Sequence, residues 1–193
     1  MKKIVLVSMA ALMLTACGPQ SKDVSVDKPV ASLSCSANFT AYKLADLPVQ
    51  FCYNKAWGEP VVTKLKGEVG SSETVTFGTA DNAKAPKLWL ATKDFKSANS
   101  ADKVVDFKFI NATIGDEQIL KKQIKDAAGY DEKDVVARKT DVSAVRAIRA
   151  DVGGKVKQIV YFVGDAFEGY NMVVSGSKDI AEEVDSFAFD IAL

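Results

Sequence analysis

The chain of 193 residues contains no histidine. Histidine is the usual acid–base group near neutral pH and a frequent zinc ligand, so its absence removes histidine-based catalytic triads and nearly all zinc sites. Glycine-rich phosphate loops, dinucleotide-binding fingerprints and Cys-x-x-Cys pairs are also missing from the sequence. Only carboxylates, lysine, serine and tyrosine could carry catalysis, and no cofactor, metal or catalytic site is predicted.

An excess of charge is missing too, because 25 basic residues face 25 acidic ones. Domains that bind nucleic acid are usually strongly basic, so no nucleic-acid partner is expected. The apolar stretch over residues 4–14 is too short to span a bilayer, which takes about 20 residues. It follows two lysines, Lys2 and Lys3, and therefore reads as a removable secretory leader.

The leader ends in the run LTACG, which places Cys17 after small residues. This arrangement resembles the signal peptide and lipobox of bacterial lipoproteins. The resemblance implies cleavage before Cys17, a diacylglycerol thioether on its sulfur and an acyl chain such as palmitate on its freed amine. Several acyl chains hold a protein stably on a membrane, whereas one binds marginally. An ordinary signal peptide that happens to precede a cysteine is the alternative.

Gly18 follows the predicted lipidated cysteine. In Gram-negative lipoproteins an aspartate at this place tends to retain the protein at the inner membrane, so the resemblance implies the outer membrane, facing the periplasm. In a Gram-positive cell this sorting argument does not apply. Removing the leader with its two lysines leaves 23 basic residues (25 − 2) against 25 acidic ones.

Residues 18–34 are polar, contain two prolines and lack aromatics, which is typical of a flexible tether. The predicted organisation is a signal peptide over residues 1–16, a lipidated cysteine and tether over 17–34, and a single globular domain over 35–193. The domain is long enough for one well-buried core.

Two cysteines remain once Cys17 is lipidated, namely Cys35 and Cys52. In an oxidising compartment an even pair predicts a disulfide, which contributes roughly 3 kcal/mol in the chain-entropy model. Two buried free thiols and a redox pair are the alternatives, although the spacing is not that of a Cys-x-x-Cys motif.

Periodicity predicts the elements of the domain. Alternating or continuous apolar runs predict strands over residues 49–53, 73–78, 87–91, 105–109, 156–163 and 170–174. The segment 142–152 fits both periods in part, and the Gly153-Gly154 pair after it favours a hairpin.

Two segments have helical spacing. The first covers residues 116–128 and has Gly129 as a C-terminal cap. The second covers residues 178–189 and is expected to pack one apolar stripe onto the sheet. This stripe consists of Ile180, Val184, Phe187 and Ile191.

Strands joined by hairpins, with few helices, predict an α+β domain on an antiparallel sheet. The segment Phe51-x-Tyr53-x-x-x-Trp57 is similar to the F-x-Y-P-x-x-W segment of the PsbP/Mog1/DcrB-like group, with Asn54 in place of the usual proline. The second half, with its hairpin, its strand around Tyr170 and its terminal helix, also resembles that group. The resemblance implies an α/β/α sandwich in which helices flank the sheet. It implies no catalytic residues, because members are mostly accessory or binding proteins.

Some residue groups have both a functional and a structural interpretation. Ser100 and Lys103 match an S-x-x-K pair, but its S-D-N and K-T-G companions are missing, which favours a polar loop. Trp57 and Trp89 could mark a ligand pocket, but aromatic residues in strands more often belong to the core. Carboxylates that could bind calcium or simply face solvent occur in two clusters: Asp131, Glu132 and Asp134, and Glu182, Glu183 and Asp185.

Basic residues concentrate in the segment 138–157, and acidic residues concentrate in 165–193. The basic segment could bind an anionic partner such as phospholipid headgroups or lipopolysaccharide. Alternatively, the two segments neutralise each other inside the domain. The basic residues are Arg138, Lys139, Arg146, Arg149, Lys155 and Lys157.

The sequence therefore predicts a membrane-anchored envelope lipoprotein with a non-enzymatic binding or accessory domain. Its partners would be the membrane, through Cys17, and an envelope protein or ligand that the sequence does not identify. Two alternatives stay open, a small cell-wall enzyme or enzyme inhibitor that uses carboxylates, and a carrier of a lipid or small apolar ligand. An enzyme would need two convergent carboxylates, and a carrier would need a deep apolar cavity.

Overall fold

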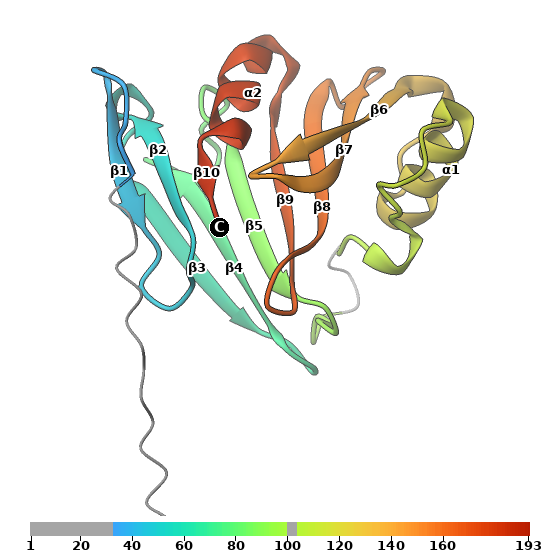
Figure 1. Cartoon of the computed structure of the whole chain (residues 1–193), viewed down its shortest axis with the longest axis horizontal. Coiled ribbons are helices and arrows are strands. Elements are labelled where there is room, and N and C mark those ends of the chain that lie inside the picture. Colours follow the sequence, from blue (N-terminus) through green and yellow to red (C-terminus); the bar gives the residue numbers. More distant parts are fainter. Residues whose placement is uncertain (1–32, 100–103) are drawn as a thin grey trace, which may run out of the picture. The chain divides into compact units, whose positions relative to one another are not determined.

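The computed structural model describes residues 33–99 and 104–193, which belong to one compact unit. Seven strands form an antiparallel sheet in the order β3-β4-β5-β9-β8-β7-β6, and three form a smaller sheet in the order β1-β2-β10 (Figure 1). The strands are β1 (Phe39–Lys43), β2 (Gln50–Asn54), β3 (Pro60–Lys66), β4 (Ser71–Phe77), β5 (Lys87–Thr92), β6 (Val135–Val142), β7 (Val145–Val152), β8 (Gln158–Phe167), β9 (Tyr170–Ser177) and β10 (Ile191–Ala192).

The prediction of an α+β domain with a sheet flanked by helices, as in an α/β/α sandwich, is wrong. The described residues form ten strands but only two α-helices, α1 (Glu117–Ala128) and α2 (Ala181–Phe189). The fold is β-rich. On one face of the large sheet the core is covered by the small sheet together with α2. The strand content was underestimated because the edge strands β3 and β6 lack a clean alternation: their exposed positions hold Val61, Leu65 and Val136 as well as charged side chains.

The core between the two sheets is built around aromatic rings. Phe187 of α2 lies 5.3 Å from Phe51 of β2 and 5.6 Å from Phe77 of β4, measured between ring centroids. Val184 is also fully buried, so the predicted apolar stripe of this helix is confirmed at its centre. Ile191 does not belong to the helix. It begins β10, which pairs with β2.

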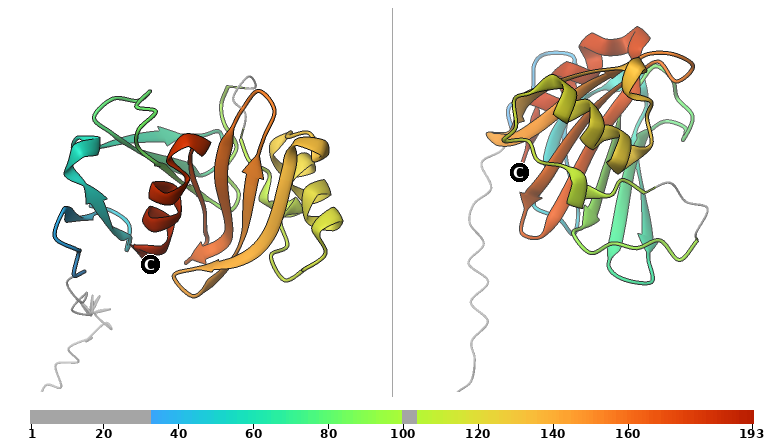
Figure 2. Two further views of the ribbon diagram at one scale, coloured as in Figure 1. Left: turned by 90° about the horizontal axis from the view of Figure 1, so that it is seen from above. Right: turned by 90° about the vertical axis from the view of Figure 1, so that its right-hand side faces the viewer.

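A second core lies on the opposite face of the large sheet, under α1 (Figure 2). Leu120 and Ile124 of α1 are fully buried there. The side chain of Asp116 accepts hydrogen bonds from the first turn of the helix, and Gly129 ends it in the left-handed conformation, with φ 76°. Gly129 was predicted as the C-terminal cap, and the helix is confirmed.

Other elements match the sequence less evenly. The strands expected over 49–53, 73–78, 87–91 and 170–174 correspond to β2, β4, β5 and β9, and the β7–β8 hairpin is confirmed. The strand expected over 105–109 is wrong, because this segment forms the 3-10 helix Phe107–Phe109. It lies over the sheet, where Phe107 stacks on Trp89 of β5, a strand whose two edges are already paired with β4 and β9.

The predicted disulfide between Cys35 and Cys52 is confirmed, with 5.6 Å between the Cα atoms. It ties the start of the domain to β2, where Cys52 is 4% exposed. The leader, Cys17 and most of the tether lie outside the described residues. Within the described ranges, no helix has the length and apolarity needed to cross a bilayer.

Candidate functional site

The β6–β7 hairpin fixes the direction of the main-chain groups of β7. Its turn consists of Ser143 and Ala144, which have φ angles of 49° and 63°. Two residues in this conformation form a tight hairpin turn, so the flanking Val142 and Val145 make the first hydrogen-bonded pair. Successive residues of a strand direct their main-chain groups to opposite neighbours. The N–H and C=O of Arg146 therefore face β8 and not β6.

The ladder between β7 and β8 stops before it reaches Arg146. Its last pair joins Ile148 to Phe162. The next hydrogen-bonded pair of a continuous ladder would join Arg146 to Gly164, and the structure does not form it. Figure 1 shows the β6–β7 hairpin turning away from the long β8–β9 hairpin at this end. Two strand edges are left open inside the sheet.

Contacts on both sides keep the two strands apart. A bulge shifts the register of β8 against β9 between Val163 and Phe167, and Asp165 within it has a φ of 56°. The side-chain oxygen of Asn171 accepts the Asp165 N–H at 3.0 Å, which satisfies the bulged backbone. On the other side, the Ser143 hydroxyl donates to the carbonyl of Ile191 and ties the β6–β7 turn to β10.

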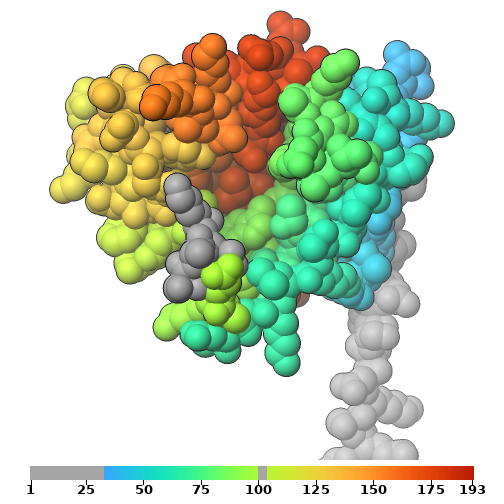
Figure 3. Space-filling view, turned by 180° about the vertical axis from the view of Figure 1, so that it is seen from behind, coloured from blue at the N-terminus to red at the C-terminus, as the bar shows by residue number. Residues whose placement is uncertain are grey.

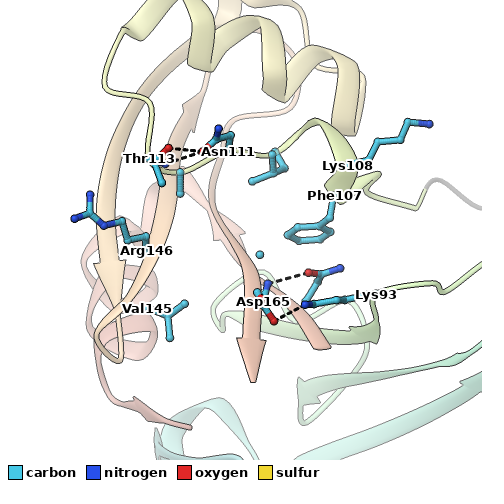
Figure 4. A pocket seen from close by; sticks show the side chains of 12 residues that line it. Lys93, Phe107, Lys108, Asn111, Thr113, Val145, Arg146 and Asp165 are labelled. Atoms are coloured by element: carbon cyan, nitrogen blue, oxygen red, sulfur yellow. Dashed lines mark hydrogen bonds and ion pairs between the residues drawn. The ribbon is translucent and has the colours of Figure 1, made fainter. Parts of the chain in front are cut away.

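A cavity of about 530 Å³ lies at this opening (Figure 4). We call it the β7–β8 cleft. Its volume is in the range of small-ligand sites. The side chains lining it come from β7, from the β8–β9 hairpin, from Lys93, and from the segment between Phe107 and Thr113. They are Lys93, Phe107, Lys108, Ile110, Asn111, Ala112, Thr113, Val145, Arg146, Gly164, Asp165 and Asn171.

A second cavity of about 530 Å³ continues along the sheet and shares Phe107 and Asn171 with the cleft. It also includes Trp89, one of the two tryptophans considered as pocket markers. The same side of the large sheet is visible in Figure 3, where it is hollowed between the α1 side and β3–β4. The other tryptophan, Trp57, is 5% exposed and belongs to the core.

The polar side chains of the cleft differ in whether they already have a partner. Asn171 is only 7% exposed, and with its oxygen occupied by the Asp165 N–H, its amide nitrogen has no hydrogen-bond partner within the described part of the chain. The Lys93 ammonium lies 2.6 Å from Asp165, and the Lys108 ammonium lies 2.7 Å from Asp106. Arg146 is thus the one lining cation without a carboxylate partner among the described residues.

No family model, curated protein or solved structure matches the chain. Functional conclusions therefore rest on the chain itself and on this cleft.

The basic segment 138–157 does not form one patch. Arg146 reaches the cleft, whereas Lys155 and Lys157 lie at the turn at the other end of β7. Arg149 is 6% exposed and forms an ion pair with Asp185 of α2 at 2.9 Å. This ion pair joins the basic segment to the acidic segment, so at Arg149 the alternative of internal neutralisation is confirmed.

Arg149 belongs to a buried network with Tyr161 and two aspartates. The Tyr161 hydroxyl donates to Asp185 at 2.7 Å, and Arg149 also pairs with Asp151. Burial and the hydrogen bond to Asp185 raise the pKa of Tyr161. Burial would lower the pKa of Arg149, but the hydrogen bond to Asp185 and the charge of Asp151 outweigh it, so that pKa is raised. The network holds α2 on the sheet.

The remaining candidates are not brought together. Glu132 pairs with Lys125 at 3.0 Å, and across residues 33–99 and 104–193 no cluster of three or more acidic or cysteine ligands could hold a metal ion. Glu182 and Glu183 are exposed on α2. Ser100, Lys103 and Cys17 lie outside the described residues.

Sequence reasoning missed the residues that shape the cleft, above all Gly164 and Asn171. The single signal was local. A continuous apolar run ends at Val163, and Gly164 and Asp165 interrupt it before the turn. This interruption could have indicated a bulge, but the distance between β7 and β8 depends on contacts with β10 that no local pattern contains.

Proposed function

We propose that this chain is a membrane-anchored lipoprotein of the bacterial cell envelope, with a non-enzymatic binding or accessory domain. Support for the anchor comes from the leader and its LTACG run. The disulfide between Cys35 and Cys52 fits an oxidising compartment, such as the periplasmic side of the outer membrane. The β7–β8 cleft is the proposed binding site of the domain.

The observation that carries a binding role is the unformed Arg146–Gly164 pair beside a cavity. Unpaired main-chain groups and the amide nitrogen of Asn171 can form hydrogen bonds to a ligand. They cannot act as general acids or bases, because amides do not gain or lose a proton near neutral pH. Hydrolysis with carboxylates would need two of them in the cleft. Among the described residues, Asp165 is the one carboxylate that lines it, and it is paired with Lys93.

A lipid carrier is less well supported. It would need an enclosed apolar cavity, whereas the β7–β8 cleft is open and is lined by Lys93, Lys108, Arg146 and two asparagines. The binding role therefore remains the proposal that the geometry favours.

The anchor is tested by Cys17→Ser. Without the thiol no thioether can form, so we expect the variant to leave the membrane fraction or to keep its leader. Fractionation and the intact mass of the wild-type protein measure this. A wild-type mass that matches an unmodified cysteine would overturn the anchor.

The binding role is tested by filling the cleft at Gly164. A Cβ atom built there lies 3.6 Å from the Phe107 ring and 4.0 Å from the Asn171 oxygen, which is ordinary contact. Gly164→Ala should therefore be tolerated, while Gly164→Leu should occupy the cleft. We expect cross-linked complexes in envelope membranes with the wild type and Gly164→Ala, and their loss with Gly164→Leu. Complexes that persist in a folded Gly164→Leu variant would place binding elsewhere.

A further inference from the structure

We propose that the ligand of the β7–β8 cleft is a short peptide segment of a partner in extended conformation, held through its main chain. This inference rests on the proposed function, because it names the ligand of the same site. Three features of the described residues favour a peptide: open main-chain groups, an opening that the fold already holds, and side chains of suitable chemistry around it.

The open main-chain groups match a strand. By the alternation of the two ladders, the main-chain N–H and C=O of Arg146 and of Gly164 belong to the strand edges that face the gap. A ligand that satisfies such a pair must itself offer a donor and an acceptor on one edge. An extended peptide does so at every second residue, which is how peptides add to open sheet edges. A simple anion offers acceptors alone, and the hydroxyls of a sugar do not repeat with the spacing of a strand.

The opening is held by the fold and does not need to be created by the ligand. β7 is fixed by its full ladder with β6, and β8 is fixed by its ladder with β9 as far as Val163. The bulge at Asp165 limits the open edge of β8 to a short stretch around Gly164. A short edge of this kind resists uncontrolled pairing with other chains, and a preformed site costs little ordering free energy on binding.

Side chains around the opening suit alternate positions of a peptide. Phe107, Ile110 and Val145 offer apolar contact. The free amide nitrogen of Asn171 can donate to a peptide carbonyl. Arg146, which lacks a carboxylate partner, favours an acidic side chain over a basic one.

The probes are seven-residue, amidated, fluorescein-labelled peptides that alternate valine with threonine. One member has glutamate at the centre and a second has lysine there. A third is the glutamate peptide with alternate main-chain nitrogens methylated on one edge, and a fourth carries the methyl groups on the other edge. Methylation removes donors while it keeps the side chains. Binding is measured by fluorescence polarisation with the full-length protein, as the cell processes it, in neutral detergent.

We expect the glutamate peptide to bind with a Kd below 1 mM, which corresponds to about −4 kcal/mol. Of the two methylated peptides, the one that has lost the donors facing the open strand edge should bind about tenfold more weakly than the parent, which corresponds to about 1.4 kcal/mol of binding free energy. Lysine at the centre should also weaken it. Glu183→Ala, on the exposed side of α2 and outside the cleft lining, should bind like the wild type, and Gly164→Leu should bind at least tenfold more weakly. Hydrogen exchange of the Arg146 and Gly164 amides should slow in the complex.

Three results would overturn the peptide proposal. They are no binding of any probe up to 1 mM, equal binding of both methylated peptides and their parent, and exchange protection that omits Arg146 and Gly164. If envelope complexes still depend on Gly164 while the peptides fail, the binding role survives and the ligand is of another class. If Gly164→Leu leaves both measurements unchanged, the cleft itself is the wrong site.

Discussion

Single residues account for much of the connection between α2 and the sheet. Arg149 is held by Asp185 through two hydrogen bonds of 2.9 and 3.1 Å, and Tyr161 donates to the same carboxylate. A buried ion pair adds little net stability, but removing one partner leaves an uncompensated charge and is costly. The network therefore fixes where α2 lies more than it adds to the total stability of the domain.

Tyr161 predicts a loss of stability in alkali. Its pKa is raised by burial and by the hydrogen bond to Asp185. In the unfolded chain the phenol titrates near pH 10. The contribution of Tyr161 is therefore complete below pH 10 and is lost as the pH rises toward its folded pKa. Urea unfolding at pH 8, 10 and 11 should show this fall, and Tyr161→Phe should make it shallower.

Two other tyrosines also have raised pKa values, so their contributions to the stability of the domain are lost in the same pH range. The comparison of the wild type with Tyr161→Phe isolates the part that comes from Tyr161. A hydrogen bond to Glu59 raises the pKa of Tyr53, and burial raises that of Tyr130. Tyr130→Phe is the matched control, because Tyr130 lies in the other core. Identical slopes for the wild type and Tyr161→Phe would contradict the role assigned to the network.

At the scale of elements, the sequence was most reliable where the signals are local. The helix over residues 116–128 has its cap, its apolar face and its terminal glycine within one continuous stretch, and α1 follows them. The alternation at 105–109 was misleading because period two says nothing about whether a strand edge is available for pairing. β3 and β6 were missed because these edge strands expose apolar and charged side chains alike, which breaks the alternation. The cleft depends on how two hairpins diverge, which no single segment encodes.

Helix α2 is expected to be structural. Phe187 is fully buried and contacts rings from both sheets. Truncating a buried phenylalanine typically costs 3–5 kcal/mol, a large part of the 5–15 kcal/mol that stabilises a domain. Phe187→Ala should therefore lower the free energy of unfolding by about 3–5 kcal/mol in urea titrations. Glu183→Ala, on the exposed side of the same helix, should change it by less than about 0.5 kcal/mol.

An unchanged unfolding midpoint for Phe187→Ala would mean that the stripe is not packed as described. The helix would then be available to a partner, and the binding surface would have to be sought there.

At the scale of the whole molecule, the disulfide joins the beginning of the domain to its core. Cys35 and Cys52 are 17 residues apart in sequence. Closing a loop of this length is worth about 3 kcal/mol in the chain-entropy model. Reduction should therefore lower the free energy of unfolding by about 3 kcal/mol. The double variant Cys35→Ser, Cys52→Ser should match the reduced wild type, and a reduced protein as stable as the oxidised one would show that the bond is dispensable.

The position of that disulfide also determines where a mechanical load would enter the domain. A pull on the chain ahead of Cys35 would pass through the sulfur bridge directly to Cys52 in β2, bypassing the five paired residues of β1. β2 is the central strand of the small sheet and carries Phe51 into the aromatic core. Tension would therefore reach a strand of the core first, and the first hairpin could not be peeled away one hydrogen bond at a time.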